Sequence, residues 1–368
     1  MSRKTVLLGP YPPPYGGVSI YIRTLYECFK DRGVEFWIFA DKEFRGPNVW
    51  FMKDKRRELL PLVMRRGADA RIADCTHFLI EYPSLFVPVW VALKGLLRFE
   101  WIKIIQDGSL PSRYKKFNPF RKALFRLAAQ SVSEFIVISE ELEKWLQEEI
   151  RVGQKVSLIK NLFPVPYRSE SASLPEEIAR SLLPYEKSGK RVCSIGVFIP
   201  SYGFKHVVAA VEKLRHETCT DIGLLLLDGD FAADERYRTR VLDGRDWITV
   251  LKNVAHPFVF EILRRSDVFV RGFGLDSYGL SRVEAIWCGL PVVATRAGET
   301  RGMLLYNFGD EEELARQLSS ALFAPPSEDG GVWSGIYQRE AEENLQKLAN
   351  KLGIGERSSL RGSAEFRE

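Results

Sequence analysis

The stretch DVFVRGFGLDSYGLSRVEAIWCGLPVVAT, residues 267–295, contains in order an apolar strand, a glycine-rich turn, a helix of small residues and a proline-led apolar strand. A strand, a helix and a second strand within about 35 residues form a βαβ unit, which favours a parallel sheet. Ligands of such sheets bind at the carboxyl ends of the strands. Two carboxylates, Asp276 and Glu284, flank this turn, so the stretch also predicts a binding site.

The same alternation runs along the rest of the chain. Strand-like runs at 5–9 and 34–40 flank a helical segment, and CTHFLIEY (75–82) is expected to be a further strand. A second series of alternating strands and helices begins at 191–198. A chain of 368 residues is also long for a single core. We therefore predict an α/β protein with two Rossmann-like, doubly wound parallel-sheet domains that face a cleft.

Composition excludes several classes of protein. The 53 basic and 48 acidic side chains leave a net charge of +5, too diffuse to indicate nucleic-acid binding. Five scattered cysteines without a C-x-x-C pair favour a reducing cytoplasm, and the four histidines show no metal spacing. The amino-terminal text is not a signal peptide. The longest apolar stretch, 84–97, is too short to span a bilayer, which takes about 20 residues.

A glycine pair opens the first predicted helix, in GPYPPPYGGVS (9–19). At a helix start, Gly16 and Gly17 would let backbone N–H groups approach a phosphate or a carboxylate. They could equally supply only the backbone angles of a tight turn. The pattern is not the G-x-G-x-x-G of dinucleotide-binding proteins.

The turn at 276–284 also has two interpretations. SRVE can be a helix capping box, with Ser281 as the N-cap and Glu284 bonding back to its amide. Alternatively, the amides of Gly279 and Leu280 hold a diphosphate, and the two carboxylates accept hydrogen bonds from sugar hydroxyls.

DSYGLSRVEAIWCGLPVVATRAG resembles the E-x7-E signature of retaining GT-B glycosyltransferases of family 4, the glycosyl transferases group 1. Asp276 and Glu284 stand at its two acids, and Tyr278, Gly279 and Leu280 stand at its F-G-L. PPPYGGVSIYIRTL, IVISEELEKWL, VSLIKNLFPVP and LLLDGD are similar to further landmarks, so the resemblance covers roughly 1–322.

The resemblance implies a hexosyltransferase-type enzyme. It would move a sugar from a nucleotide-sugar donor to a glycan or lipid-linked acceptor, with retention, in polysaccharide or cell-surface glycan biosynthesis. Front-face attack in this class requires no nucleophilic carboxylate. No cofactor and no metal are expected, because protein cations and amides take the charge of the leaving diphosphate.

The resemblance also implies roles for residues. Glu284 would bind the ribose, and Asp276 would bind the transferred sugar. The expected catalytic residues are Asp276, Glu284 and Arg271. The expected donor-binding residues are Gly16, Gly17, Lys205, Lys252, Asn253, Tyr278, Gly279, Leu280 and Ser281.

Two departures from the family pattern concern charge and the acceptor side. Val197 and Tyr202 stand where the family carries the Arg and Lys of V-G-R-x-x-x-x-K-G. Another cation is therefore expected at the diphosphate, with Arg271 as the first choice and Lys205 as the second. Gln106 and Asp107 stand where the family carries a histidine, and they are the predicted acceptor-side residues.

The resemblance and the composition together define the expected domains. A stretch rich in proline, serine and charge separates the two series of strands. The predicted parts are an N-terminal acceptor-side domain (1–165), a linker (166–190), a C-terminal donor domain (191–330), a helix that packs back on the N-terminal domain (331–355) and a disordered tail (356–368).

Two basic segments in the acceptor domain raise the question of membrane contact. RYKKFNPFRKALFR (113–126) has six basic residues interleaved with apolar ones, and 53–67 is similar in character. They are either solvated helix faces or a peripheral attachment to the anionic inner face of a membrane, as a lipid-linked acceptor would require.

Two other functions remain open at this stage. An NAD-type oxidoreductase would use the first βαβ unit, with Asp41 at the end of its second strand as the ribose-binding acid. A non-catalytic GT-B protein would serve as a scaffold in a glycan-assembly complex, and Val197 and Tyr202 favour that alternative.

Overall fold

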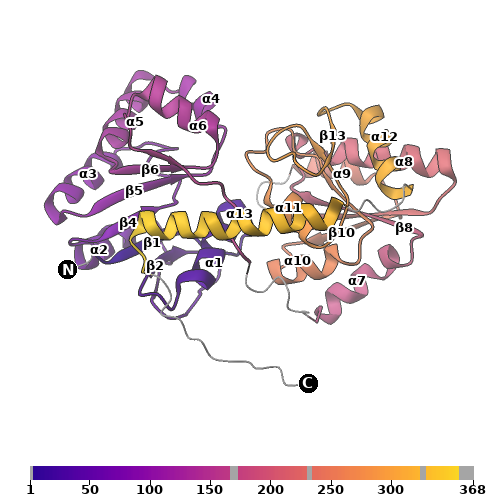
Figure 1. The fold of residues 1–368 in the computed structure, drawn as a ribbon, viewed down its shortest axis with the longest axis horizontal. Coiled ribbons are helices and arrows are strands. Elements are labelled where there is room, and N and C mark those ends of the chain that lie inside the picture. The colour runs from indigo at the N-terminus through magenta and orange to yellow at the C-terminus, as the bar shows by residue number, and fades with distance from the viewer. Residues whose placement is uncertain (1–2, 166–172, 230–233, 324–328, 356–368) are drawn as a thin grey trace.

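The computed structural model of the protein describes residues 3–165, 173–229, 234–323 and 329–355. The chain forms two α/β lobes, with a long helix running across both of them (Figure 1). Every strand pair in the two sheets is parallel. The predicted fold class, two doubly wound parallel-sheet domains, is confirmed.

The first domain is built on a seven-stranded sheet of order β3-β2-β1-β4-β5-β6-β7. Its strands are β1 (Thr5–Pro10), β2 (Glu35–Phe39), β3 (Val49–Phe51), β4 (Arg71–Asp74), β5 (Glu100–Ile105), β6 (Glu134–Val137) and β7 (Val156–Leu158). Its helices are α1 (Gly17–Phe29), α2 (Lys55–Arg66), α3 (Phe86–Leu97), α4 (Leu110–Lys115), α5 (Pro119–Ser131) and α6 (Glu140–Trp145), which continues as a π-helical turn, η1 (Leu146–Ile150).

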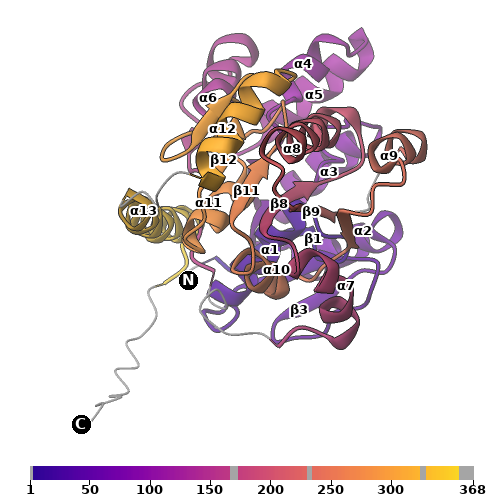
Figure 2. The same ribbon diagram turned by 90° about the vertical axis from the view of Figure 1, so that its right-hand side faces the viewer.

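The second domain has a six-stranded sheet of order β10-β9-β8-β11-β12-β13. Its strands are β8 (Lys190–Gly196), β9 (Ile222–Asp228), β10 (Ile248–Lys252), β11 (Val268–Arg271), β12 (Val292–Thr295) and β13 (Leu304–Tyr306). Its helices are α7 (Glu176–Glu186), η2 (Pro200–Tyr202), α8 (Phe204–Thr218), α9 (Glu235–Leu242), α10 (His256–Leu263), α11 (Leu280–Trp287) and α12 (Glu311–Phe323). Figure 2 shows α12 and α8 on one side of this sheet and α10 and α7 on the other.

The last helix, α13 (Asp329–Leu352), connects the two domains. Tyr337 and Ala341 are buried in the core of the second domain, whereas Leu348 and Leu352 are buried in the core of the first. The hydroxyl of Thr5 donates a hydrogen bond to the carbonyl of Leu352, at 2.8 Å. Apolar residues on one helix thus tie the two lobes together. The expected tail, 356–368, lies outside the described residues.

Two expectations about local structure are wrong. CTHFLIEY is not a strand, because the sheet strand β4 ends at Asp74. The buried Asp74 carboxylate accepts hydrogen bonds from the backbone N–H and the hydroxyl of Thr76, which turn the chain out of the sheet. Leu79 and Ile80 then enter the core from a turn rather than from a strand.

The expected linker is also shorter than 166–190, because α7 occupies part of it. Leu182 and Tyr185, three positions apart on this helix, are buried in the core of the second domain. The Tyr185 hydroxyl donates to Ser266 Oγ at 2.7 Å. The abundance of proline and serine concealed this short amphipathic pattern.

The basic segment 113–126 folds as α4 and α5, and most of its apolar residues face the core. Phe117, Leu124 and Phe125 are buried, and only Phe120 is strongly exposed. The interleaving of basic and apolar residues is thus the pattern of amphipathic helices covering the sheet. In the part of the chain that the structure describes, no helix is long and apolar enough to cross a membrane.

Candidate active site

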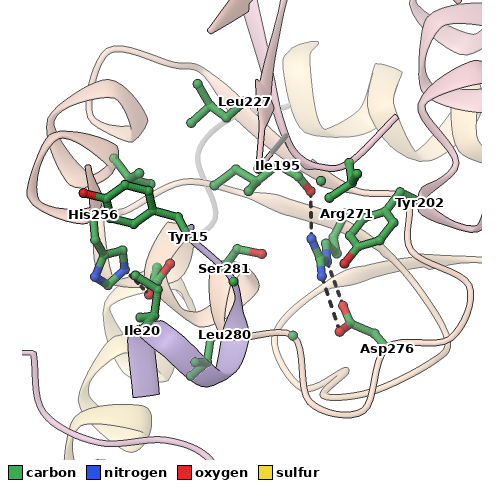
Figure 3. Close-up of a pocket in the computed structure, with 18 of the residues that line it drawn as sticks. Tyr15, Ile20, Ile195, Tyr202, Leu227, His256, Arg271, Asp276, Leu280 and Ser281 are labelled. Atoms are coloured by element: carbon green, nitrogen blue, oxygen red, sulfur yellow. Dashed lines mark hydrogen bonds and ion pairs between the residues drawn. The ribbon is translucent and has the colours of Figure 1, made fainter. Parts of the chain in front are cut away.

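A cavity of about 290 Å³ lies between the two domains. Its lining residues follow the carboxyl ends of strands in both sheets, as expected for ligand sites of parallel sheets. Gly16, Gln106 and Asn161 come from the first domain, and Arg271 and Glu284 from the second. In Figure 3, Tyr15 and His256 lie at one end of the cavity, and Arg271 and Asp276 lie at the other.

The glycine pair forms a fixed turn at one wall of the cavity. Gly16 is the N-cap of α1, and its N–H donates to Ser19 Oγ at 3.0 Å. The Ser19 hydroxyl donates in turn to the carbonyl of Pro14, at 2.7 Å. A methyl group added at Gly17 would meet no atom within 4 Å, so the helix start borders open space. Both interpretations of this glycine pair are compatible with the geometry.

Arg271 and Asp276 form a buried ion pair at the other end. Arg271 Nε donates to Asp276 Oδ2 at 2.7 Å, and Nη1 donates to the carbonyl of Ile195 at 2.7 Å (Figure 3). Burial lowers the pKa of the Arg271 guanidinium, but the Asp276 carboxylate outweighs this effect and the net shift is upward. The two residues therefore form one ion-paired unit in the cavity wall.

Two aromatic rings cover the Arg271 guanidinium. Tyr202 and Phe273 stack with centroids 4.1 Å apart, and the guanidinium lies 5.4 Å from each ring. Tyr202 is the residue that replaces the family's lysine. Cation–π contact of this kind favours a retained positive charge at Arg271.

Arg282 is a second buried cation that the sequence analysis missed. Its side chain is fully buried, and Nη1 donates to the carbonyls of Thr295 and Glu299 at 3.1 and 2.8 Å. Nη2 lies 3.4 Å from Asp276 Oδ2. Burial lowers the pKa of Arg282 to about 10, so the group is still protonated at neutral pH. Together, Arg271, Arg282 and Asp276 carry one net positive charge.

Glu284 is buried, and its carboxylate contacts His256. The distance between Glu284 Oε1 and His256 Nε2 is 2.7 Å. His256 is the first residue of α10 and also lines the cavity. The sequence did not reveal this contact, because the two residues are 28 positions apart.

The capping-box interpretation of SRVE is wrong. The N-cap of α11 is Gly279, whose φ of 81° is in the left-handed region that favours glycine, and Ser281 lies inside the first turn. Ser281 Oγ has no hydrogen-bond partner among the described residues. Glu284 accordingly lines the cavity, where it contacts His256, instead of bonding back to the helix start.

Most of the residues expected at the site line the cavity. They are Gly16, Gly17, Gln106, Asn253, Arg271, Asp276, Tyr278, Gly279, Leu280, Ser281 and Glu284. Lys205, Lys252 and Asp107 are not among the lining residues. Lys205 and Lys252 have exposed side chains at strand and helix ends, and Asp107 forms an ion pair with Arg113. The described residues contain no group of three or more His, Cys, Asp or Glu side chains placed to hold a metal ion.

The fold and a family match together define the class of protein: it is a GT-B glycosyltransferase. Residues 189–323 match the model of the family described as glycosyl transferases group 1, so this part of the chain is a glycosyl transferases group 1 domain. That class overturns the NAD-type alternative. Asp41, its proposed ribose-binding acid, is exposed and is not one of the residues that line the cavity.

Solved structures show the same fold at low sequence identity. Alr3699/HepE from Anabaena, in complex with UDP and glucose, is 16% identical with a TM-score of 0.72, covering 95% of this chain and 100% of that one. Sucrose-phosphate synthase from Thermosynechococcus elongatus is 18% identical with a TM-score of 0.62, covering 96% and 97%. WaaG, a glycosyltransferase involved in lipopolysaccharide biosynthesis, is 14% identical with a TM-score of 0.66, covering 95% and 100%. No curated protein sequence matches the chain significantly.

Proposed function

We propose that this glycosyltransferase takes a sugar from a nucleoside-diphosphate sugar and transfers it, with retention, to a glycan or lipid-linked acceptor in polysaccharide or cell-surface glycan biosynthesis. One observation carries the proposal: the start of α11, the buried cation Arg271 and the buried carboxylate Glu284 line one cavity. HepE, which shares the fold, was solved with UDP-glucose, and WaaG acts in lipopolysaccharide biosynthesis.

The diphosphate would lie at the amino-terminal end of α11. Backbone N–H groups at a helix start and the helix dipole favour an anion there. Ser281 Oγ, unpartnered among the described residues, adds a donor at the same point. The Arg271 guanidinium lies beside this helix start. The second guanidinium, that of Arg282, leaves one net positive charge there. We propose that these groups, without a metal ion, stabilise the charge that gathers on the departing nucleoside diphosphate.

The nucleoside would lie toward the His256 end of the cavity. Glu284 would accept hydrogen bonds from the ribose hydroxyls, while its other oxygen contacts His256. Asn253 lines the same end after β10 and would border the base. Lys252 is exposed beside it. In this arrangement the transferred sugar would lie near Asp276 and the first domain.

A thermal-shift panel of UDP-, GDP-, ADP- and TDP-sugars tests the proposal. A ligand at 100 times its dissociation constant adds about 2.7 kcal/mol to the free energy of unfolding. We expect one base to raise the melting temperature, and release of nucleoside diphosphate to follow on incubation with the matching sugar nucleotide. Binding without release would favour the non-catalytic scaffold, for which Tyr202 in place of lysine is the supporting observation. No shift with any nucleotide would refute the proposal.

We further propose a peripheral contact between the first domain and an anionic membrane. α3 packs against α5, and the two helices expose Leu85 at the start of α3, Val89, Leu96 and Phe120. Exposed basic residues stand close to Phe120 in the sequence: Lys115 and Lys116 at the end of α4, and Arg121 and Arg126 in α5. Apolar side chains next to basic ones favour the surface of an anionic bilayer, where each cation contributes about 1 kcal/mol.

Vesicle sedimentation at low salt tests this contact. The protein should bind phosphatidylglycerol vesicles and not phosphatidylcholine vesicles, and neutralising Lys115, Lys116, Arg121 and Arg126 should release it. A matched variant neutralises four exposed basic residues of the second domain, Arg180, Lys187, Arg236 and Arg240, and should still bind. Equal loss in both variants would indicate only a dependence on net charge, and absence of wild-type binding would refute the contact.

A further inference from the structure

Two side-chain amides of the first domain meet at the cavity wall. Gln106 follows β5, Asn161 follows β7, and both line the cavity. Asn161 Nδ2 donates to Gln106 Oε1 at 3.2 Å. Across the cleft, Ser277 Oγ lies 3.4 Å from the backbone carbonyl of Gln106. The pair therefore lies where the two domains approach each other. Its contact in the second domain, Ser277, is the residue that follows Asp276.

The pair leaves two hydrogen-bonding groups unsatisfied. The exposed fractions of Gln106 and Asn161 are only 8% and 7%. Gln106 Nε2 and Asn161 Oδ1 have no hydrogen-bond partner among the described residues. Turning both amides over would preserve their mutual bond and would still leave one NH₂ group and one carbonyl oxygen without a partner. Buried polar groups in proteins are normally paired, so this pair is incomplete without a ligand.

We propose that Gln106 and Asn161 recognise a hydroxyl group of an uncharged sugar in the cavity. This inference rests on the proposed function. A hydroxyl both donates and accepts, so one such group can satisfy the free NH₂ and the free carbonyl oxygen together. A carboxylate only accepts and an ammonium group only donates, so neither can satisfy both.

The charges around the pair also favour an uncharged sugar. Among the described residues, those of the first domain that line the cavity are Tyr15, Gly16, Gly17, Val18, Ile20, Gln106 and Asn161. None of them carries a charge at neutral pH. On the facing wall, the guanidinium of Arg271 is already bonded to Asp276. Because the one net positive charge on that wall is assigned to the diphosphate, a sugar carboxylate beside Gln106 and Asn161 would lose its hydration without gaining a cation of its own, which is unfavourable.

The hydroxyl can belong to the sugar of the donor or to a sugar acceptor, and calorimetry separates these sources. The nucleoside diphosphate selected by the thermal-shift panel and its glucose ester are titrated into the full chain, and glucose is titrated into protein saturated with the nucleoside diphosphate. The variant is Asn161→Ala. Asn350→Ala, an exposed asparagine on α13, is the matched control. Asn161→Leu, which is close to asparagine in shape but has no hydrogen-bonding group, is the second variant if Asn161→Ala fails to fold.

We expect Asn161→Ala to weaken binding of the sugar-bearing ligand about 10-fold and to change binding of the nucleoside diphosphate less than 2-fold. Weaker binding of the glucose ester by the variant assigns the hydroxyl to the donor. Weaker binding of free glucose assigns it to the acceptor. The wild type should also bind the glucuronate ester at least 10-fold more weakly than the glucose ester. Unchanged binding of both sugar ligands by Asn161→Ala, or by Asn161→Leu where the alanine variant fails to fold, overturns the inference and leaves the proposed function standing. Failure of the wild type to bind any nucleoside diphosphate overturns both.

Discussion

Replacing Glu284 by alanine separates a binding role from a structural one. Glu284 is buried in the cavity wall and contacts His256 at 2.7 Å. If its carboxylate also accepts bonds from a ribose, each such bond involves a charged acceptor and contributes about 1.5–3 kcal/mol. Because 1.4 kcal/mol corresponds to a factor of ten, Glu284→Ala should raise the donor dissociation constant by about 10- to 150-fold.

The same change also destabilises the fold, so stability has to be measured separately. His256 Nε2 loses its bond to Glu284, and losing one bond of a buried polar group costs about 1–3 kcal/mol. Glu311→Ala is the matched control, because Glu311 Oε1 contacts His206 Nδ1 at 2.8 Å on the same domain without lining the cavity. Urea unfolding should show a loss of stability in both variants, whereas titration calorimetry should show a loss of donor affinity only in Glu284→Ala.

A third variant, Glu284→Gln, refines the comparison. The amide can still bond to His256, so the free energy of unfolding should fall less than in Glu284→Ala. It carries no charge, so donor affinity should still fall. A Glu284→Ala protein that is destabilised but binds the donor as tightly as the wild type would refute the ribose role. Glu284 would then be only a structural partner of His256.

Three further outcomes are expected. Arg271→Ala should lower turnover about 100-fold, because one preorganised charge is lost, and Lys205→Ala should lower turnover less. Equal turnover in both variants and the wild type would contradict the assignment of Arg271 as the cation at the diphosphate. Bonds from Arg301 outweigh burial and lower the pKa of Glu299 to about 2, so its stabilisation is present above pH 4.5 and is lost as the pH falls toward 2. Glu299→Gln should therefore flatten the decline in the free energy of unfolding between pH 6 and pH 3, by up to about 2 kcal/mol, as measured by urea titration at those two pH values. Gly279→Ala should lower the melting temperature and donor affinity together, because φ is 81° and the new methyl group would lie 2.8 Å from its neighbours; an unchanged melting temperature would show that the turn can relax.

The architecture could be read from the sequence because periodicity is a local property. Strand runs alternating with helices predicted both sheets. The errors arose where a distant contact determines the local structure. The turn after Asp74 is bonded to the buried Lys103, whose ammonium group lies 3.3 Å from the Glu81 carboxylate. Nothing local to CTHFLIEY reveals that partner.

The candidate site was predictable in position but not in its contacts. The two acids, the glycine turn and Arg271 share one short stretch, so their convergence on the cavity followed from a single βαβ unit. The buried position of Arg282 could not be predicted, because its guanidinium is bonded to the carbonyls of Thr295 and Glu299, which come later in the chain. His256 and Asn161 approach from other segments, and a lone histidine or asparagine carries no spacing pattern that would reveal such a contact.

The contact between Arg271 and Asp276 changes the problem of the missing Arg and Lys. By spacing alone these two residues are a free cation and a free acid with separate tasks. In the fold, Asp276 has two guanidinium partners, at 2.7 and 3.4 Å. The acid therefore pairs with both cations, with Arg271 in the cavity wall and with the fully buried Arg282, where an unpaired charge would be costly to bury. One net positive charge remains beside the start of α11, and it adds to the helix dipole. A diphosphate can thus be stabilised without a basic side chain at Val197 or Tyr202, because the charge is supplied from β11 and α11.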